Sequence, residues 1–450
     1  MIDSSPARSA GNREVEQDQV RFSGRLINGA KRLILAYLRV SAFVCNTNGD
    51  IPLAKLLILK NRLSENAKLA NPLWGWLRAS LCSTLFGMKL RVVLLGALLG
   101  VLLTASAALA QPASQPQTPQ AAEGDFVTHN FHFHDGESLA ELRLHYTSFG
   151  KPAVDSNGRV TNAVLILHGT TGSGHQFVRE QFSGYLFGPG QLLDAAKYYI
   201  ILPDSIGHGH SSKPSDGMHA HFPHYDYDDM VAAQHLLLTE GLKVNHLRLV
   251  MGTSMGCMHS WIWLETYPDF MDAAMPLACQ PVQIAGRNRM MRKMIMDDIV
   301  NDPDYNHGDY THQLAGMRSV YDIFLIMASS PLQMQKNFPT RDQADDYLKQ
   351  FEDREMASSD PNDVLYAFDA SRTYDPSAKL GEIKAPVMFV NSADDQINPP
   401  ELGIAEQEIK KVKRGRFVLL PITDQTRGHG THTLPAVWHQ YLEELLEESK

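Results

Sequence analysis

The feature that most constrains this chain is Gly252-x-Ser254-x-Gly256, which lies between an apolar run and a helix-like run. Residues 247–251 are almost wholly apolar, and residues 257–264 have the composition of a buried helix. A serine at a tight strand-to-helix turn is held clear of the sheet, where a base can reach its hydroxyl. The glycines let the strand and the helix approach closely and accommodate a strained backbone at the serine. We therefore predict a nucleophilic serine at Ser254 on a strand–turn–helix unit.

Short apolar runs recur along the chain and alternate with helix-like stretches. Near-continuous apolar runs are typical of parallel strands that are buried on both faces, and their alternation with helices indicates an α/β fold. The first two runs instead have the period-two alternation of antiparallel strands. We predict a mostly parallel eight-stranded sheet with helices on both faces, with strands at residues 126–134, 139–146, 163–167, 198–202, 247–251, 273–277, 386–390 and 416–420.

The rhythm of strands is interrupted between the sixth and the seventh strand. Residues from about 281 to 374 are helix-like, rich in methionine and charged. Long insertions in compact domains tend to be functional, so we predict a helical lid over the active site, with a purely structural insertion as the alternative. Before this insertion, one helix has clear boundaries: Asp228 and Asp229 cap it, residues 230–239 form it and Gly241 ends it.

The N-terminal part of the chain has the pattern of an export signal. Residues 88–110 combine a basic start, an apolar run and an A-x-A site at their end, which is the order found in a secretory signal peptide. Residues 111–125 are rich in Pro and Gln and are predicted to be a disordered mature start. Since a signal peptide belongs at the N-terminus, residues 1–87 are interpreted as a mis-called start or a disordered leader. A membrane anchor is the alternative, because the apolar run is nearly long enough to span a bilayer.

Composition limits the partners of the chain. An apolar content of 44% allows a large core, and the net charge of −9 argues against nucleic acid as a partner. Two of the four cysteines, Cys257 and Cys279, follow the leader; two buried free thiols are favoured, and a disulfide in an oxidising compartment is the alternative. We predict no cofactor and no metal, since irregular spacing disfavours a site among His219, His221, His224, Asp226 and Asp228.

A serine nucleophile needs a base and an orienting carboxylate, which in this type of sheet follow the serine in the order Asp, then His. Asp395 comes after the seventh predicted strand in a D-x-I-x-P pattern, and His429 comes after the eighth strand behind a glycine. Both follow carboxyl ends of strands, where sites gather in open α/β sheets. We predict Asp395 and His429 as the triad partners of the serine, with Asp394 and His432 as the alternatives, because loop registers are hard to predict.

The oxyanion of an acyl-transfer intermediate needs two backbone N–H donors. Met255 supplies one, because it directly follows the serine, and the loop at residues 167–172 is expected to supply the other at Thr170. Gly169 permits close approach of this loop, and no chemical role is assigned to His168. At the entrance of the predicted lid, Arg287, Arg289 and Arg292 could hold a substrate carboxylate, or they could form a solvated face with methionines packed behind it.

These segments resemble the α/β-hydrolase superfamily and, within it, the homoserine O-acetyltransferase group. The resemblance covers about residues 126–446 and rests on residues 167–172, 188–190, 252–256 and 302–310, together with Asn288-x-x-x-Arg292. It implies the α/β-hydrolase fold, an acyl-enzyme mechanism, and Asn288 and Arg292 as residues lining the substrate pocket. The chain departs from the group at Cys257, where a second glycine is usual, and at Gly430, where an aspartate usually follows the histidine.

Together these observations predict an exported serine hydrolase of the esterase type, periplasmic or secreted and without stable membrane association after signal cleavage. Its partner is expected to be a small-molecule ester or acyl donor. One alternative is an O-acyltransferase that resembles the homoserine enzymes. Another is a non-catalytic binding protein on the same fold, since a fold does not imply a function.

Overall fold

The computed structural model describes residues 120–450. The predicted leader (1–87), the predicted signal peptide (88–110) and all but the end of the predicted disordered start (111–125) lie outside the described residues. Within 120–450, no helix is long and apolar enough to cross a membrane.

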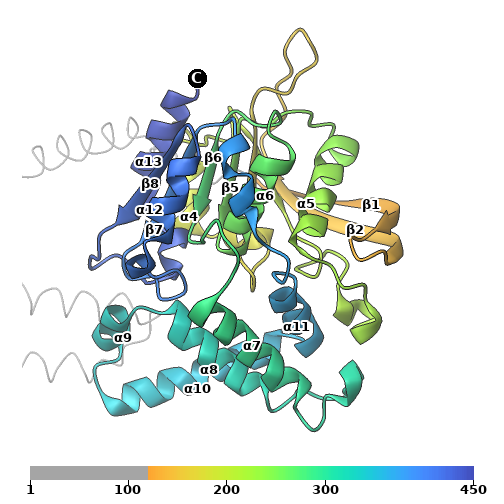
Figure 1. Cartoon of the computed structure of the whole chain (residues 1–450), viewed down its shortest axis with the longest axis vertical. Coiled ribbons are helices and arrows are strands. Elements are labelled where there is room, and N and C mark those ends of the chain that lie inside the picture. The colour runs from red at the N-terminus through yellow and green to blue at the C-terminus, as the bar shows by residue number, and fades with distance from the viewer. Residues whose placement is uncertain (1–119) are drawn as a thin grey trace, which may run out of the picture. The chain divides into compact units, whose positions relative to one another are not determined.

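An eight-stranded sheet forms the centre of the described structure (Figure 1). Its strand order is β1-β2-β4-β3-β5-β6-β7-β8; β2 is antiparallel to β1 and β4, and the pairs from β4 to β8 are parallel. This confirms the predicted mostly parallel sheet. The strands are β1 (Ala122–His132), β2 (Ser138–Phe149), β3 (Ala163–Leu167), β4 (Tyr199–Pro203), β5 (Leu249–Thr253), β6 (Ala274–Leu277), β7 (Val387–Ser392) and β8 (Gly415–Leu420).

Each predicted strand overlaps an observed one, and the differences lie at the ends. β1 begins at Ala122, so residues 122–125, which were predicted to belong to a disordered start, pair instead with the end of β2. β5 extends through Thr253, which brings the strand directly up to Ser254. Apolar composition does not define this last boundary, because Gly252 and Thr253 continue the ladder through backbone hydrogen bonds with β3 and β6.

Helices cover both faces of the sheet, as predicted. In β3, Leu165 and Leu167 face one core while Val164 and Ile166 face the other, which is the two-residue alternation of a strand buried on both sides. α5 (Tyr227–Leu236) and α6 (Met255–Thr266) pack in the first core, and α4 (Glu180–Leu186) and α13 (Pro435–Glu448) pack in the second. The short α12 (Ile404–Glu408) also contributes to the first core.

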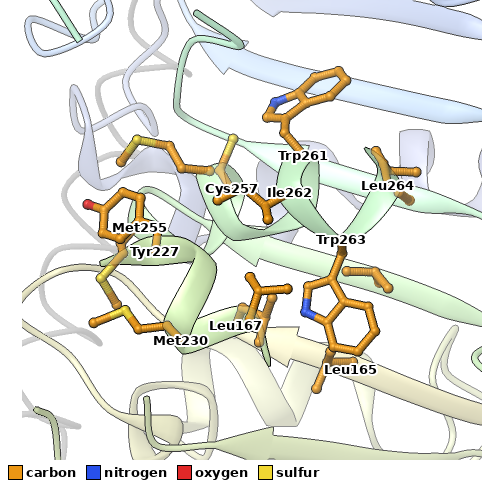
Figure 2. Close-up of a cluster of buried hydrophobic side chains, with 14 of the residues drawn as sticks. Leu165, Leu167, Tyr227, Met230, Met255, Cys257, Trp261, Ile262, Trp263 and Leu264 are labelled. Atoms are coloured by element: carbon orange, nitrogen blue, oxygen red, sulfur yellow. The ribbon is translucent and has the colours of Figure 1, made fainter. Parts of the chain in front are cut away.

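The helix that follows the candidate nucleophile is buried almost all around. Trp261 and Trp263 of α6 are fully buried and project in different directions, with Leu165 and Leu167 of β3 in the same cluster (Figure 2). A helix that is apolar on all sides belongs in the interior of a protein. α6 is therefore a rigid base for the turn that precedes it.

The start of α5 differs from the prediction. Asp226, rather than Asp228 or Asp229, is the N-cap residue, and it forms a capping box in which its side chain and that of Asp229 each accept the other residue's backbone N–H. The helix ends at Leu236 and continues as one π-helical turn, Leu237–Gly241, so Gly241 does mark the end of the helical segment.

A helical insertion separates β6 from β7 and lies as a layer beside the sheet (Figure 1). It has its own apolar core, formed mainly by α7 and α8 and including Phe368 of the last helix, and Ile397 of the loop after β7 joins this core. The predicted helical insertion at about 281–374 is thus present, with helices α7 (Gly286–Val300), α8 (Met317–Ala328), α9 (Pro331–Asn337), α10 (Arg341–Ser358) and α11 (Pro361–Asp369).

Candidate active site

Ser254 occupies a strained turn between β5 and α6. Its backbone has φ 55° and ψ −110°, a conformation that residues with a side chain rarely adopt. Both flanking glycines are required here, because a Cβ on Gly252 would collide with the carbonyl of Gly256 and a Cβ on Gly256 would collide with the carbonyl of Leu167. The N–H of Ser254 donates to the carbonyl of Leu277 in β6 at 2.9 Å. The close crossing of strand and helix therefore holds the serine side chain at the end of the sheet.

His429 and Asp395 join Ser254 in a continuous hydrogen-bonded chain. Nε2 of His429 lies 2.8 Å from Oγ of Ser254, and its Nδ1 lies 2.9 Å from Oδ2 of Asp395. The structure thus brings the three predicted residues together, although 175 positions separate the serine from the histidine. This is the spatial arrangement in which an imidazole can take a proton from a hydroxyl while a carboxylate orients the ring.

Asp395 is fully buried and held by several donors. The N–H groups of Ile397 and Asn398 donate to its Oδ1, and the Asn398 side chain donates to its Oδ2. Burial by itself raises the pKa of this carboxyl, but the charge and hydrogen bond of His429 and the hydrogen bonds of Asn398 outweigh it and leave the pKa below its ordinary value. The carboxylate therefore stays ionised beside the imidazole.

The two alternative residues have other roles. Asp394 does not contact the histidine ring; its Oδ2 accepts the N–H of Gly428 at 2.9 Å, directly before His429, and its Oδ1 accepts the hydroxyl of Ser392. The ring of His432 lies 5.1 Å from that of His429, edge to face, and burial followed by the charge of His429 lowers its pKa to about 3. The neutral His432 packs against His429. The geometry favours Asp395 and His429 over Asp394 and His432 as the partners of Ser254.

The loop after β3 lies against the nucleophile. A Cβ built on Gly169 would lie 3.4 Å from that of Ser254, which places the next residue, Thr170, at the serine. Within the described residues, neither the N–H of Thr170 nor that of Met255 has a hydrogen-bond acceptor. Two unpaired backbone donors beside this serine have the geometry that an oxyanion needs, and the oxyanion role of these two residues stays a prediction.

Two buried histidines, neither of which has a role predicted from the sequence, hold this loop. His168 accepts the N–H of Ser205 at Nε2, and its Nδ1 lies 2.8 Å from the carbonyl of Gly169. Burial, and next the charge of His208, lower the pKa of His168 to about 4, so the neutral ring can donate to that carbonyl. Nε2 of His208 lies 2.7 Å from the carbonyl of Thr170. Both histidines follow the carboxyl end of a strand, β3 or β4, and this position was the feature of the sequence that could have indicated a role at the site.

Cys257 and Cys279 form a disulfide, so the prediction of two free thiols is wrong. Their Cα atoms are 5.8 Å apart, within the range that a disulfide spans. Both side chains are buried, as predicted, and the adjacent α6 and β6 bring these two positions together in the folded chain.

The predicted substrate residues of the insertion contact each other. Nε of Arg292 donates to Oδ1 of Asn288 at 3.1 Å, its Nη1 donates to Ser371, and its guanidinium lies over the ring of Phe368. Arg292 is 3% exposed, and among the ion pairs of residues 120–450 none joins it to a carboxylate. A buried cation without an acidic partner is costly, so this group is suited to receive an anion.

The other arginines and methionines at the start of α7 match neither predicted alternative, a carboxylate site or a solvated face with methionines packed behind it. Arg287 donates to the carbonyl and the side chain of Gln396 in the loop that follows Asp395. Met290 and Met294 are 61% and 53% exposed, whereas Met291 is buried. The methionines therefore do not all pack behind the arginines.

Two cavities lie between the sheet and the insertion. One of about 730 Å³ is bordered by Thr170 and His208 from the sheet side and by Phe368 from α11. The other, of about 400 Å³, is bordered by Asn398, by Met258 of α6 and by Asn288 of α7. Ser254 borders neither cavity directly. Thr170, in the loop beside the serine, borders the larger cavity, and Asn398, which is hydrogen-bonded to Asp395, borders the smaller one.

The histidine and aspartate residues considered for a metal do not form one site. Only Asp226 and Asp228 of that set come together, with His134 in place of the other histidines. Oδ1 of Asp226 accepts the N–H of Asp229 and Oδ2 accepts the hydroxyl of Thr373, so this carboxylate serves the helix cap.

Comparison with known proteins identifies the family of the fold. The profile of the alpha/beta hydrolase fold matches residues 162–418. The chain belongs to the α/β-hydrolase family. In this α/β hydrolase the matched region contains Ser254 and Asp395, and His429 lies just beyond it.

Relatives of this α/β hydrolase are enzymes of acyl transfer. A probable acyltransferase of Methanothermobacter thermautotrophicus is 30% identical over 278 residues, which cover 62% of this chain and 84% of that one. A homoserine O-acetyltransferase of Pelobacter propionicus is 29% identical over 336 residues, which cover 66% and 88%. The structure of the acetyl esterase MekB has 26% identity and a TM-score of 0.63, and covers 72% of this chain and 97% of that one. The chain is an enzyme of the ester hydrolase or acetyltransferase type.

Proposed function

We propose that this α/β hydrolase is an exported serine esterase that works through an acyl-enzyme. The observation that carries the proposal is the hydrogen-bonded chain from Ser254 through His429 to Asp395, with the free N–H groups of Thr170 and Met255 beside the serine. The residue roles are part of this proposal.

The proposed reaction proceeds in two acyl transfers. His429 takes the proton of the Ser254 hydroxyl at Nε2 while Oγ attacks the ester carbonyl, and the N–H groups of Thr170 and Met255 hold the oxyanion. As the intermediate collapses, the bond to the leaving alkoxide breaks and His429 donates its proton to that oxygen. The same histidine then takes a proton from water, which attacks the carbonyl of the acyl-enzyme. As the bond between the acyl group and Oγ breaks, His429 donates that proton to Ser254 and the carboxylic acid leaves. Asp395 stabilises the imidazolium in both halves.

Export is supported by the sequence pattern of residues 88–110 and by the disulfide. Structural disulfides persist in oxidising compartments and are rare in the cytosol, and Cys257–Cys279 is buried in the core. An exported enzyme has no supply of acetyl-CoA, a cytoplasmic donor, and this favours water as the acyl acceptor.

A second candidate function is acyl transfer to a hydroxyl acceptor that carries a carboxylate, such as homoserine. Arg292 favours it, because this residue is buried, is hydrogen-bonded to Asn288 and has no acidic partner among the described residues. The presence of Gly430, at the position where the homoserine enzymes usually have an aspartate, argues against recognition of an amino-acid ammonium.

Product partitioning distinguishes the two functions. The purified protein is given p-nitrophenyl acetate with excess L-homoserine, and the acetylated products are identified by mass spectrometry, with Ser254→Ala as the control for uncatalysed acetylation. Free acetate alone is the expected result. O-acetylhomoserine formed only by the unaltered protein would establish the transferase instead, and no turnover of either kind would reject both.

A further inference from the structure

The disulfide lies at the base of the candidate active site. Cys257 is in the first turn of α6, directly after the turn that carries Ser254, and Cys279 follows the end of β6. The two side chains are 0% and 1% exposed. The bond therefore joins the elbow helix to the chain segment Leu277–Cys279, which we call the β6 terminal segment.

The β6 terminal segment contacts both ends of the triad. The carbonyl of Leu277 accepts the N–H of Ser254 at 2.9 Å. The carbonyl of Ala278 accepts the Asn398 side chain at 3.1 Å, and the same amide nitrogen donates to Oδ2 of Asp395, also at 3.1 Å. One short segment thus fixes the backbone of the nucleophile and the residue that orients the acid.

The same segment is strained. Ala278 has φ +64°, a left-handed conformation that is unfavourable for a residue with a Cβ and persists only where the surroundings impose it. Its N–H donates to the carbonyl of Val390 in β7 at 3.0 Å. Ala278 is therefore held by this hydrogen bond, by the one from the Asn398 side chain, and by the covalent bond that the next residue, Cys279, forms with Cys257.

We propose that the Cys257–Cys279 disulfide is a positioning element of the triad and that its reduction lowers kcat while leaving the fold in place. The inference rests on the proposed function, because it takes Ser254 and Asp395 as the reacting groups. A dithiol supplies two electrons and two protons: the S–S bond breaks, two thiols form, and the dithiol closes to a cyclic disulfide. The freed β6 terminal segment relaxes, so Ser254 and Asp395 lose their mutual alignment. Substrate contacts made by the insertion stay, so KM is retained.

The test compares the oxidised protein with the protein reduced by dithiothreitol. Alkylation and mass spectrometry count the free thiols, p-nitrophenyl acetate gives kcat and KM, and a fluorophosphonate probe gives the labelling rate of Ser254 independently of any ester. We expect kcat and the labelling rate to fall about tenfold or more, as displaced catalytic groups require, with KM within about twofold and the circular dichroism unchanged. Because the bond is buried, the variant Cys257→Ser/Cys279→Ser provides the disulfide-free state directly; it should show the same loss and no response to dithiothreitol.

Several results would overturn the proposal. If Ser254 of the disulfide-free protein is labelled at the full rate, the disulfide has no positioning role. If the loss of activity is accompanied by unfolding in the circular dichroism spectrum, the disulfide stabilises the whole fold instead. If oxidised protein is labelled but hydrolyses no ester, the proposed function fails while the labelling ratio still decides the role of the disulfide. If neither form is labelled, the proposed function fails and this inference fails with it.

Discussion

The strand ends and the helical insertion, which form the two sides of the candidate site, are built differently. On the strand side, Asp395 is fully buried, His429 is 5% exposed, and both are fixed by hydrogen bonds from neighbouring loops. On the insertion side, α7 exposes Met290 and Met294, and its buried Arg292 forms no ion pair with a carboxylate within residues 120–450. If the proposed function holds, this difference means that the buried groups at the strand ends perform the chemistry, while the insertion sets which molecule is accepted.

The largest expected effect is loss of the nucleophile. Ser254→Ala should lower kcat by about 10⁴-fold or more, since removing one triad member typically has this effect, and should leave thermal unfolding nearly unchanged. Ester hydrolysis under saturating substrate and a thermal melt are the measurements. A variant that keeps most of its activity would show that the chemistry does not take place at the strand ends.

The two neighbouring aspartates provide a matched pair on the strand side. Asp395→Ala should lower kcat by about 10⁴-fold, because the imidazolium loses its counter-charge and its orientation. Asp394→Ala should lower it by only about tenfold, because it frees the N–H of Gly428 and lets the histidine loop shift. The kcat values of the two variants are compared with the same ester. Equal losses would show that the hydrogen bond to His429 does not identify the acid.

On the insertion side the effect should appear in KM. Arg292→Gln should raise KM about tenfold for an ester or acceptor that carries a carboxylate, which corresponds to losing one charge-assisted hydrogen bond. Turnover of the neutral p-nitrophenyl acetate should change by less than about twofold. Arg289→Gln, on the same helix, is the control. A similar loss with both substrates would mean that Arg292 supports the fold and does not select the ligand.

The junction of the two sides should affect the stability of the protein and leave turnover unchanged. Asp363 of α11 accepts hydrogen bonds from the N–H and hydroxyl of Ser215 on the sheet side. Burial raises the pKa of Asp363 to about 6 in spite of these bonds, whereas the unfolded value is about 3.9.

The direction of the pH effect follows from this raised pKa. Between about pH 4 and 6 the folded state binds more protons at Asp363 than the unfolded state, so its contribution to stability falls as the pH rises. Asp363→Asn removes this dependence. Urea unfolding is measured at pH 4, 5, 6 and 7. As the pH rises over this range, the free energy of unfolding of the variant should increase relative to that of the unaltered protein by at most about 3 kcal/mol. A constant difference across this range would contradict the raised pKa.

Local patterns were sufficient for much of this protein. Buried parallel strands are apolar along their whole length, so the composition of residues 163–167 predicted β3 to the residue. The elbow was likewise predictable, because Gly252 and Gly256 are required by a crossing of strand and helix within one short segment. Asp395 and His429 followed from their positions after strands, although choosing between them and Asp394 or His432 needed the hydrogen bonds of the folded chain.

What the sequence alone determined is therefore the set of elements and the residue types at their ends, because these depend on neighbours along the chain. The tertiary structure decided which distant groups meet. It joined Cys257 to Cys279, brought His168 and His208 within hydrogen-bonding distance of the carbonyls of the loop after β3, and placed Arg292 against Asn288 and Phe368. Such contacts depend on the order of strands in the sheet and on the packing of helices across it, which no local pattern records.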